Sequence, residues 1–191
     1  MDLILLAISA IFVNNILLAQ YLGNCPFCGV SKKLSTSVGM GAAVIFVATM
    51  ASVFTWAVYH CVLVPYDLKF IQTLVFILII ASLVQFVEIF LKKFSKPLYN
   101  ALGIYLPLIT TNCAVMGIAL LNVKYEFGFW EMLIFSIASA SGFTLAIILF
   151  ATIRERLFIA PVPHFMKGTA IALVTAGIMS LSFMGFAGMV K

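Results

Sequence analysis

Six apolar stretches, each long enough to cross a bilayer, fill almost the whole sequence. A membrane-spanning helix needs about 20 predominantly apolar residues. Hydrophobic residues make up 64% of the chain and charged residues 9%, against about 45–50% and about 25% in soluble domains. The sequence therefore predicts an all-α integral membrane protein with six transmembrane helices in a single domain, residues 1–191. The stretches lie at about Leu3–Leu22, Val38–Val62, Phe70–Leu91, Leu98–Leu121, Trp130–Ile153 and Gly168–Val190.

The basic residues between these stretches are divided unequally between the two sides of the membrane. Eight of the 11 follow the first, third and fifth stretches: Lys32, Lys33, Lys92, Lys93, Lys96, Arg154, Arg156 and Lys167. Basic residues collect in short cytoplasmic loops, so both termini are predicted to be extracytoplasmic. The start of the chain lacks the basic region of a cleavable signal, and we expect the first stretch to remain as a helix. The net charge of +5 then follows from membrane topology and needs no nucleic-acid partner.

One short motif occurs twice, at positions separated by nearly half the chain. Asn24-Cys25-x-x-x-Gly29 returns as Asn112-Cys113-x-x-x-Gly117, near the end of the first apolar stretch of each three-helix half. The halves, about 1–95 and 96–191, read as two repeats. Three crossings per repeat give the second copy the opposite orientation, the inverted arrangement of transporters with broken helices at the midplane. We therefore predict breaks in helices one and four, with Cys25 and Cys113 approaching each other near the bilayer centre.

The two symmetry-related thiols have two interpretations. They can form a metal or cluster site on unwound backbone, or they can be small buried side chains at a helix break. Cys25 and Cys28 also form a C-x-x-C pair, which can be a redox dithiol or half of a metal site. Met116 occupies the position that matches Cys28, which favours a packing role for Cys28. An iron–sulfur cluster takes four ligands, so a cluster on Cys25 and Cys113 would need two more from a second chain.

The remaining polar residues are few. Glu88 precedes Lys92 by one helical turn, so it can pair with that lysine or line an ion path. Cys61 has no counterpart in the repeat and is expected to be inert. The sequence shows no phosphate-binding glycine loop, so any redox role would be electron transfer without NAD bound to this chain. The side chains that could line a path or bond between helices are Asn14, Asn15, Gln20, Gln85 and Thr111.

Four runs resemble the A-type subunits of the Rnf complex, and the resemblance covers the whole chain. They are LGNCPFCGVSKK at 22–33, LGIYLPLITTNC at 102–113, IRER at 153–156 and TAGIMS at 175–180. The resemblance implies an ion-translocating ferredoxin:NAD⁺ oxidoreductase of a prokaryotic plasma membrane, coupled to Na⁺ or H⁺ transport. It implies that Cys25 and Cys113, beside Asn24 and Asn112, supply half the ligands of a [2Fe–2S] cluster. A homologous, oppositely oriented RnfE-type subunit would supply the rest.

The resemblance also implies other partner subunits, and three alternative functions stay open. The B, C, D and G subunits of Rnf would connect the chain indirectly to ferredoxin and NAD. Cys28 departs from the family pattern, in which a residue other than Cys is usual. An NqrE-like subunit of the Na⁺-translocating NADH:quinone reductase has the same overall motif pattern, although Thr111 and the sequence Cys25-Pro26-Phe27 are closer to Rnf. A secondary transporter, or a membrane thiol oxidoreductase that uses Cys25 and Cys28, are the remaining alternatives.

Overall fold

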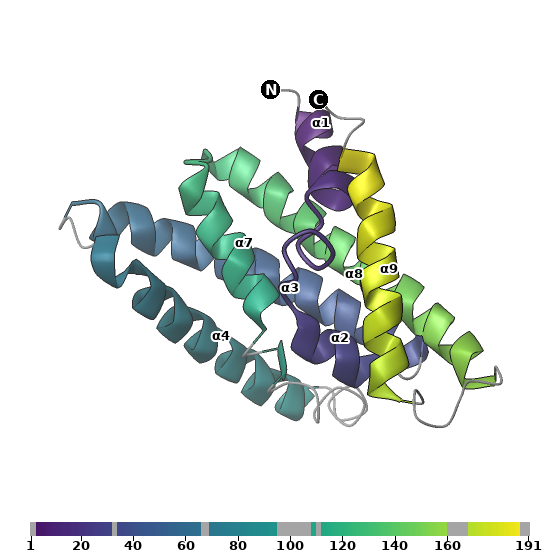
Figure 1. The fold of residues 1–191 in the computed structure, drawn as a ribbon. Helices are drawn as coiled ribbons and strands as arrows, with labels where there is room; N and C mark the ends of the chain where they lie inside the picture. The colour runs from purple at the N-terminus through teal and green to yellow at the C-terminus, as the bar shows by residue number, and fades with distance from the viewer. Residues whose placement is uncertain are drawn as a thin grey trace.

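The computed structural model describes residues 3–31, 34–65, 69–94, 108–109, 112–159 and 168–187, and all regular elements in these ranges are helical (Figure 1). The all-α prediction is therefore confirmed for the described residues. In order, the elements are α1 (Leu3–Ile8), the π-helix η1 (Ser9–Val13), α2 (Asn24–Val30), α3 (Leu34–Val58), the π-helix η2 (Tyr59–Leu63), the 3₁₀ turn η3 (Lys69–Ile71), α4 (Gln72–Phe94), α7 (Cys113–Lys124), α8 (Phe129–Ile159) and α9 (Thr169–Ala187).

Three of these helices are apolar and long enough to cross a membrane. They cover Leu34–Leu63, Gln72–Ile89 and Phe129–Ile159, which correspond to the predicted second, third and fifth stretches. The first and last have 30 and 31 residues, or about 45 Å at about 1.5 Å per residue. Since the hydrocarbon core is about 30 Å thick, these two helices would be tilted or would extend beyond it. Shorter apolar helices cover Leu3–Val13, Cys113–Lys124 and Thr169–Gly185.

The core forms where α3 and α8 pack against each other in opposite directions. Gly41 of α3 lies against Thr144 of α8, and the Thr144 hydroxyl donates to the Gly41 carbonyl at 3.2 Å. A glycine here lets the two backbones approach closely, as small residues do between membrane helices. Phe143 and Phe150 of α8 are fully buried in the same core. The ring of Phe27 in α2 stacks on Phe150 with centroids 3.9 Å apart, which fixes α2 to the core.

Contacts between connections show which helix ends lie together. The Arg154 guanidinium donates to the Ser31 hydroxyl at 3.0 Å, so the end of α2 lies beside the end of α8. At the opposite end of α8, the indole N–H of Trp56 donates to the Phe127 carbonyl at 3.3 Å. The C-terminal ends of α2 and α8 are therefore neighbours, and the α7–α8 turn lies beside the far end of α3. Figure 1 shows the start of α1 and the end of α9 at one end of the molecule.

The first apolar stretch is not one continuous helix. Its helical part ends at Val13, residues 14–22 form an irregular linker, and helix resumes at Asn24. The interruption precedes the cysteine motif, which itself begins the second helical piece. The predicted break near Pro107 in the fourth stretch lies outside the described residues. Helix α7 begins at Cys113, so the second cysteine motif also stands at a helix start.

Candidate functional site

The two cysteine motifs begin their helices in slightly different ways. In the first copy Gly23 is the N-cap, with φ of +95°, and Asn24 is the first helical residue. In the second copy Asn112 is the N-cap, and its side-chain oxygen accepts from the Ala114 amide at 3.0 Å, as N-cap side chains commonly do. The two asparagines therefore differ by one helix position, because Asn112 is the N-cap of its helix and Asn24 is the first residue of its helix.

The structure brings the two motifs together. The backbone N–H of Gly23 donates to the Cys113 sulfur at 2.9 Å, across 90 residues of sequence. A Cβ placed on Gly23 would lie 2.7 Å from the Phe143 ring and 3.2 Å from the Ala114 Cβ. Any other residue would collide there and would also be strained by the left-handed backbone. Gly23 is therefore required by the contact between the motifs, a role that the sequence alone did not reveal.

The four predicted site residues differ in exposure. Cys25 and Asn24 are exposed, Cys113 is half-buried, and Asn112 is 2% exposed. The Nδ2 group of Asn112 is a buried donor without a hydrogen-bond partner among the described residues. The site therefore has an open side at Cys25 and a closed, polar side at Asn112.

Of the two remaining cysteines, only Cys61 has a described side chain. The free thiol of Cys61 is exposed in η2, near His60 and Trp56, whose rings lie 4.3 Å apart at the far end of α3. The side chain of Cys28 lies outside the described part. No group of three or more His, Cys, Asp or Glu side chains comes together among the described residues.

The linker before the first motif is fixed to α8 by Asn15. This buried side chain donates from Nδ2 to the Gly142 carbonyl at 2.8 Å and to the Ile11 carbonyl at 3.1 Å. Its Oδ1 accepts from the Leu17 amide at 3.1 Å. Gly142 leaves room for the linker, because a Cβ there would lie 3.0 Å from the Ile11 carbonyl oxygen. Of the two roles considered for Asn15, the structure supports bonding between helices.

The linker is also fixed to α9 and α7. The buried Ser180 hydroxyl donates to the Leu18 carbonyl at 2.7 Å and accepts from the Tyr21 hydroxyl at 2.9 Å. On the other side, Leu22 packs so closely on Gly117 that a Cβ there would be 2.6 Å from it. Ser180 ends the TAGIMS run at 175–180, but nothing in the sequence indicated that Ser180 and Tyr21 contact each other. They became visible only because the fold places α9 beside the linker.

The other polar candidates are dispersed. Glu88 is half-buried on α4, but the Lys92 side chain that was predicted to pair with it lies outside the described part, as does Thr111. Gln20 and Gln85 are exposed. The side chain of Asn14 is exposed, and its Nδ2 group donates to the nearby Ser9 hydroxyl at 3.5 Å.

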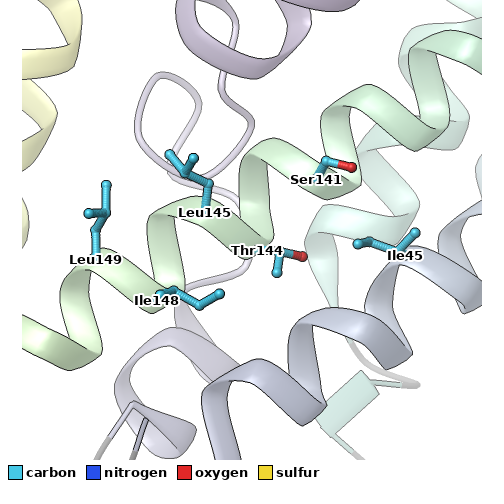
Figure 2. A pocket seen from close by; sticks show the side chains of 6 residues that line it. All are labelled: Ile45, Ser141, Thr144, Leu145, Ile148 and Leu149. Atoms are coloured by element: carbon cyan, nitrogen blue, oxygen red, sulfur yellow. The ribbon is translucent and has the colours of Figure 1, made fainter. Parts of the chain in front are cut away.

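An apolar groove of about 330 Å³ opens between α3 and α8, away from the cysteines. Figure 2 shows Thr144 of α8 and Ile45 of α3 reaching toward each other in it. Its two hydroxyls are engaged. Ser141 donates to the Ile137 carbonyl, and Thr144 shares its one proton between the carbonyls of Ala140, at 2.8 Å, and Gly41, at 3.2 Å. The groove therefore presents aliphatic surface, typical of a contact with lipid or with another helix. Its lining consists of Ile45, Ser141, Thr144, Leu145, Ile148 and Leu149.

Two helical pieces, one before the linker and one that begins at the second motif, are each about half as long as a membrane crossing. Leu3–Val13 has 11 residues and α7 has 12, or about 16 Å and 18 Å at about 1.5 Å per residue. The hydrocarbon core is about 30 Å thick. The first helix interruption, at Val13, and the start of α7 therefore each lie about half a membrane crossing from the other end of their helical piece.

Comparisons with known proteins agree over the whole chain. A family model described as "Rnf-Nqr subunit, membrane protein" matches residues 3–190. The A-type subunit of the Na⁺-translocating ferredoxin:NAD⁺ oxidoreductase complex of Acetobacterium woodii is 56% identical over 189 residues, 99% of this chain and 98% of the relative. The A-type subunit of the ion-translocating oxidoreductase complex of Syntrophotalea carbinolica is 54% identical over 189 residues, with the same coverage. The protein of that name in Cronobacter sakazakii is 53% identical over 190 residues, 100% of this chain and 98% of the relative.

Proposed function

Because the chain belongs to the Rnf–Nqr family of membrane subunits, we propose that it is the A-type subunit of an ion-translocating ferredoxin:NAD⁺ oxidoreductase. Its part in that activity is to carry electrons within the bilayer. The observation that carries the proposal is the meeting of the two motifs, in which the turn before Cys25 binds the sulfur of Cys113. Relatives that are more than half identical over their full length bear names of the same complex.

The proposed electron carrier is a [2Fe–2S] cluster, with Cys25 and Cys113 as two of its four ligands. These two thiols suit such a cluster, because they lie on either side of one turn and the exposed thiol, Cys25, leaves an open side for a second chain. The Gly23 amide is a further fit, since hydrogen bonds to sulfur are among the features that tune such clusters. When bound, the cluster would accept and release one electron. A homologous RnfE-type subunit would supply the other two thiolates.

The chain's own residues would hold this site rigid, and a carrier at the site would divide electron transfer across the membrane into shorter steps. Asn15 and Ser180 fix the linker to α8 and α9, and Asn112 caps the helix that carries Cys113. A carrier near the middle of a core of about 30 Å leaves two steps of about 15 Å each. The B, C, D and G subunits of the complex would provide the reactions with ferredoxin and NAD.

We further propose the finer topology of six spans in two inverted repeats, with basic connections in the cytoplasm and both termini outside. The neighbouring helix ends at Ser31 and Arg154 support the alternation of sides. The interrupted first stretch, and the start of α7 at Cys113, support broken helices one and four. The coupling ion is Na⁺ or H⁺. The name of the Acetobacterium woodii relative favours Na⁺.

Co-expression with an RnfE-type partner tests the cluster and separates the rival functions. The purified pair, this chain together with that partner, should contain iron and acid-labile sulfide and absorb visible light, whereas the chain purified alone should contain neither at full stoichiometry. A secondary transporter would instead be active as a single protein without iron. A membrane thiol oxidoreductase would form a mixed disulfide with a substrate protein through Cys25 or Cys28. An iron-free pair would contradict the proposed function.

A further inference from the structure

Ser180 of α9 differs from neighbouring hydroxyl residues on the same helix. Thr175 and Ser182 each donate to a carbonyl of α9 itself, four residues earlier, at 2.7 and 3.0 Å. Ser180 is 1% exposed and donates instead to the Leu18 carbonyl in the linker. It also accepts from the Tyr21 hydroxyl, so both of its hydrogen bonds leave the helix. A single buried side chain thus holds two points of the linker, three residues apart.

The held segment ends at the amide that binds the Cys113 sulfur. Tyr21 has φ of +55°, a left-handed conformation that a non-glycine residue adopts at a cost and keeps only when its surroundings fix it. Two residues later, Gly23 has φ of +95° and directs its N–H to Cys113. The direction of that N–H depends on the turn before it. Ser180 holds this turn from α9, together with the bond from the Leu22 amide to the Ile16 carbonyl at 3.1 Å within the linker.

We propose that Ser180 and Tyr21 are positioning residues that set the hydrogen bond from the Gly23 amide to the Cys113 sulfur, and through it the reduction potential of the cluster. The inference rests on the proposed cluster site. An N–H donated to a ligating sulfur stabilises the more negative, reduced state, so holding the bond raises the potential. Helix α9, which supplies neither cysteine, thereby acts on the redox site.

The test measures the potential of the cluster in the purified pair by redox titration, followed by electron paramagnetic resonance. Ser180→Ala and Tyr21→Phe should each lower the potential while iron per pair stays unchanged. The expected change in the redox equilibrium is up to about tenfold, or about 59 mV for one electron. Both variants break the hydrogen bond between Tyr21 and Ser180. The double variant should therefore shift the potential by much less than the sum of the two single shifts. Ser180→Thr, which keeps the hydroxyl, should restore the original value.

Ser182→Ala is the matched control, because it removes an exposed hydroxyl that is bonded only within α9. It should leave the potential unchanged. Hydrogen exchange at residues 16–24, measured by mass spectrometry on the same pairs, reports the tether without the cluster. It should accelerate in Ser180→Ala but not in Ser182→Ala.

The two measurements separate the possible failures. A wild-type pair without iron contradicts the proposed function, while the exchange comparison still decides whether Ser180 holds the linker. A pair with a normal cluster whose potential is the same in Ser180→Ala, Tyr21→Phe and wild type overturns the positioning role. That holds even if exchange accelerates, because Ser180 would then be a structural tether only.

Discussion

At the scale of single residues, the site depends on positions whose importance comes from what surrounds them. Gly23 must be glycine because its backbone is left-handed and the Phe143 ring fills the space where a Cβ would lie. Gly39 is different, because no atom lies within 4 Å of its Cβ position on α3. Both glycines lie among apolar residues in the sequence, which does not show that one is tightly packed and the other is not.

Gly23→Ala should therefore destabilise the protein, whereas Gly39→Ala should not. The cost at Gly23 is expected to be about 2–4 kcal/mol from the collision and the backbone strain together. At Gly39, alanine should be neutral or stabilising by up to about 1 kcal/mol, because it is the better helix former. Thermal unfolding of the purified pair, followed by circular dichroism, measures both. Equal melting temperatures for the two variants would contradict the tight contact between the motifs.

Adjacent asparagines provide a second comparison at this scale. Asn15→Ala removes two donated bonds and leaves the Leu17 amide unpaired in a buried setting, at an expected cost of about 2–4 kcal/mol. Asn14→Ala removes one long, exposed bond, and surface changes of that kind stay within about 0.5 kcal/mol. Denaturant or thermal unfolding of the two variants should separate them clearly. A similar loss in both would mean that Asn15 does not anchor the linker.

At the scale of elements, the sequence predicted what local composition controls. The long apolar helices α3, α4 and α8 follow from length and hydrophobicity, and the structure contains all three. The linker at 14–22 could not be placed in the same way. Its residues Ile16, Leu17 and Leu18 are as apolar as any helix and are buried in the core. The linker is stabilised by Gly142 and Ser180, more than 100 residues away, and such tertiary contacts leave no local pattern.

The site shows the same division. The repeated Asn-Cys-x-x-x-Gly pattern singled out two segments, and the bond from the Gly23 amide to the Cys113 sulfur brings these segments together. It could not predict that Gly23 contacts the sulfur, or that Asn112 caps a helix while Asn24 is exposed. Those differences arise because the helix begins one residue earlier, relative to the motif, in the first copy than in the second. The two motifs match residue for residue, so their sequence does not show this difference.

At the scale of the whole molecule, the arrangement of connections carries a topological prediction. The Arg154–Ser31 bond places the ends of α2 and α8 side by side, and the Trp56–Phe127 bond places the far end of α3 beside the start of α8 at the opposite end. Basic residues follow the first, third and fifth stretches, so the positive-inside rule predicts that these three connections are cytoplasmic. Reporter fusions should therefore place Lys93 in the cytoplasm and Lys191 outside. A cytoplasmic Lys191 would contradict the topology and the opposite orientation of the two halves.

The central claim is that both motifs contribute to one cluster, and iron per purified pair in four cysteine variants tests it most directly. A serine hydroxyl replaces a ligating thiolate poorly, so Cys25→Ser and Cys113→Ser should each lose the iron and the ferredoxin-dependent reduction of NAD⁺. Cys28→Ala and Cys61→Ala remove small side chains and should keep the iron, with a stability cost on the order of 1 kcal/mol. Cys28 lies in the same short helix as Cys25 and so controls for general disruption. If Cys28→Ala loses the iron while Cys113→Ser keeps it, the shared site is wrong, and the redox centre is the C-x-x-C pair.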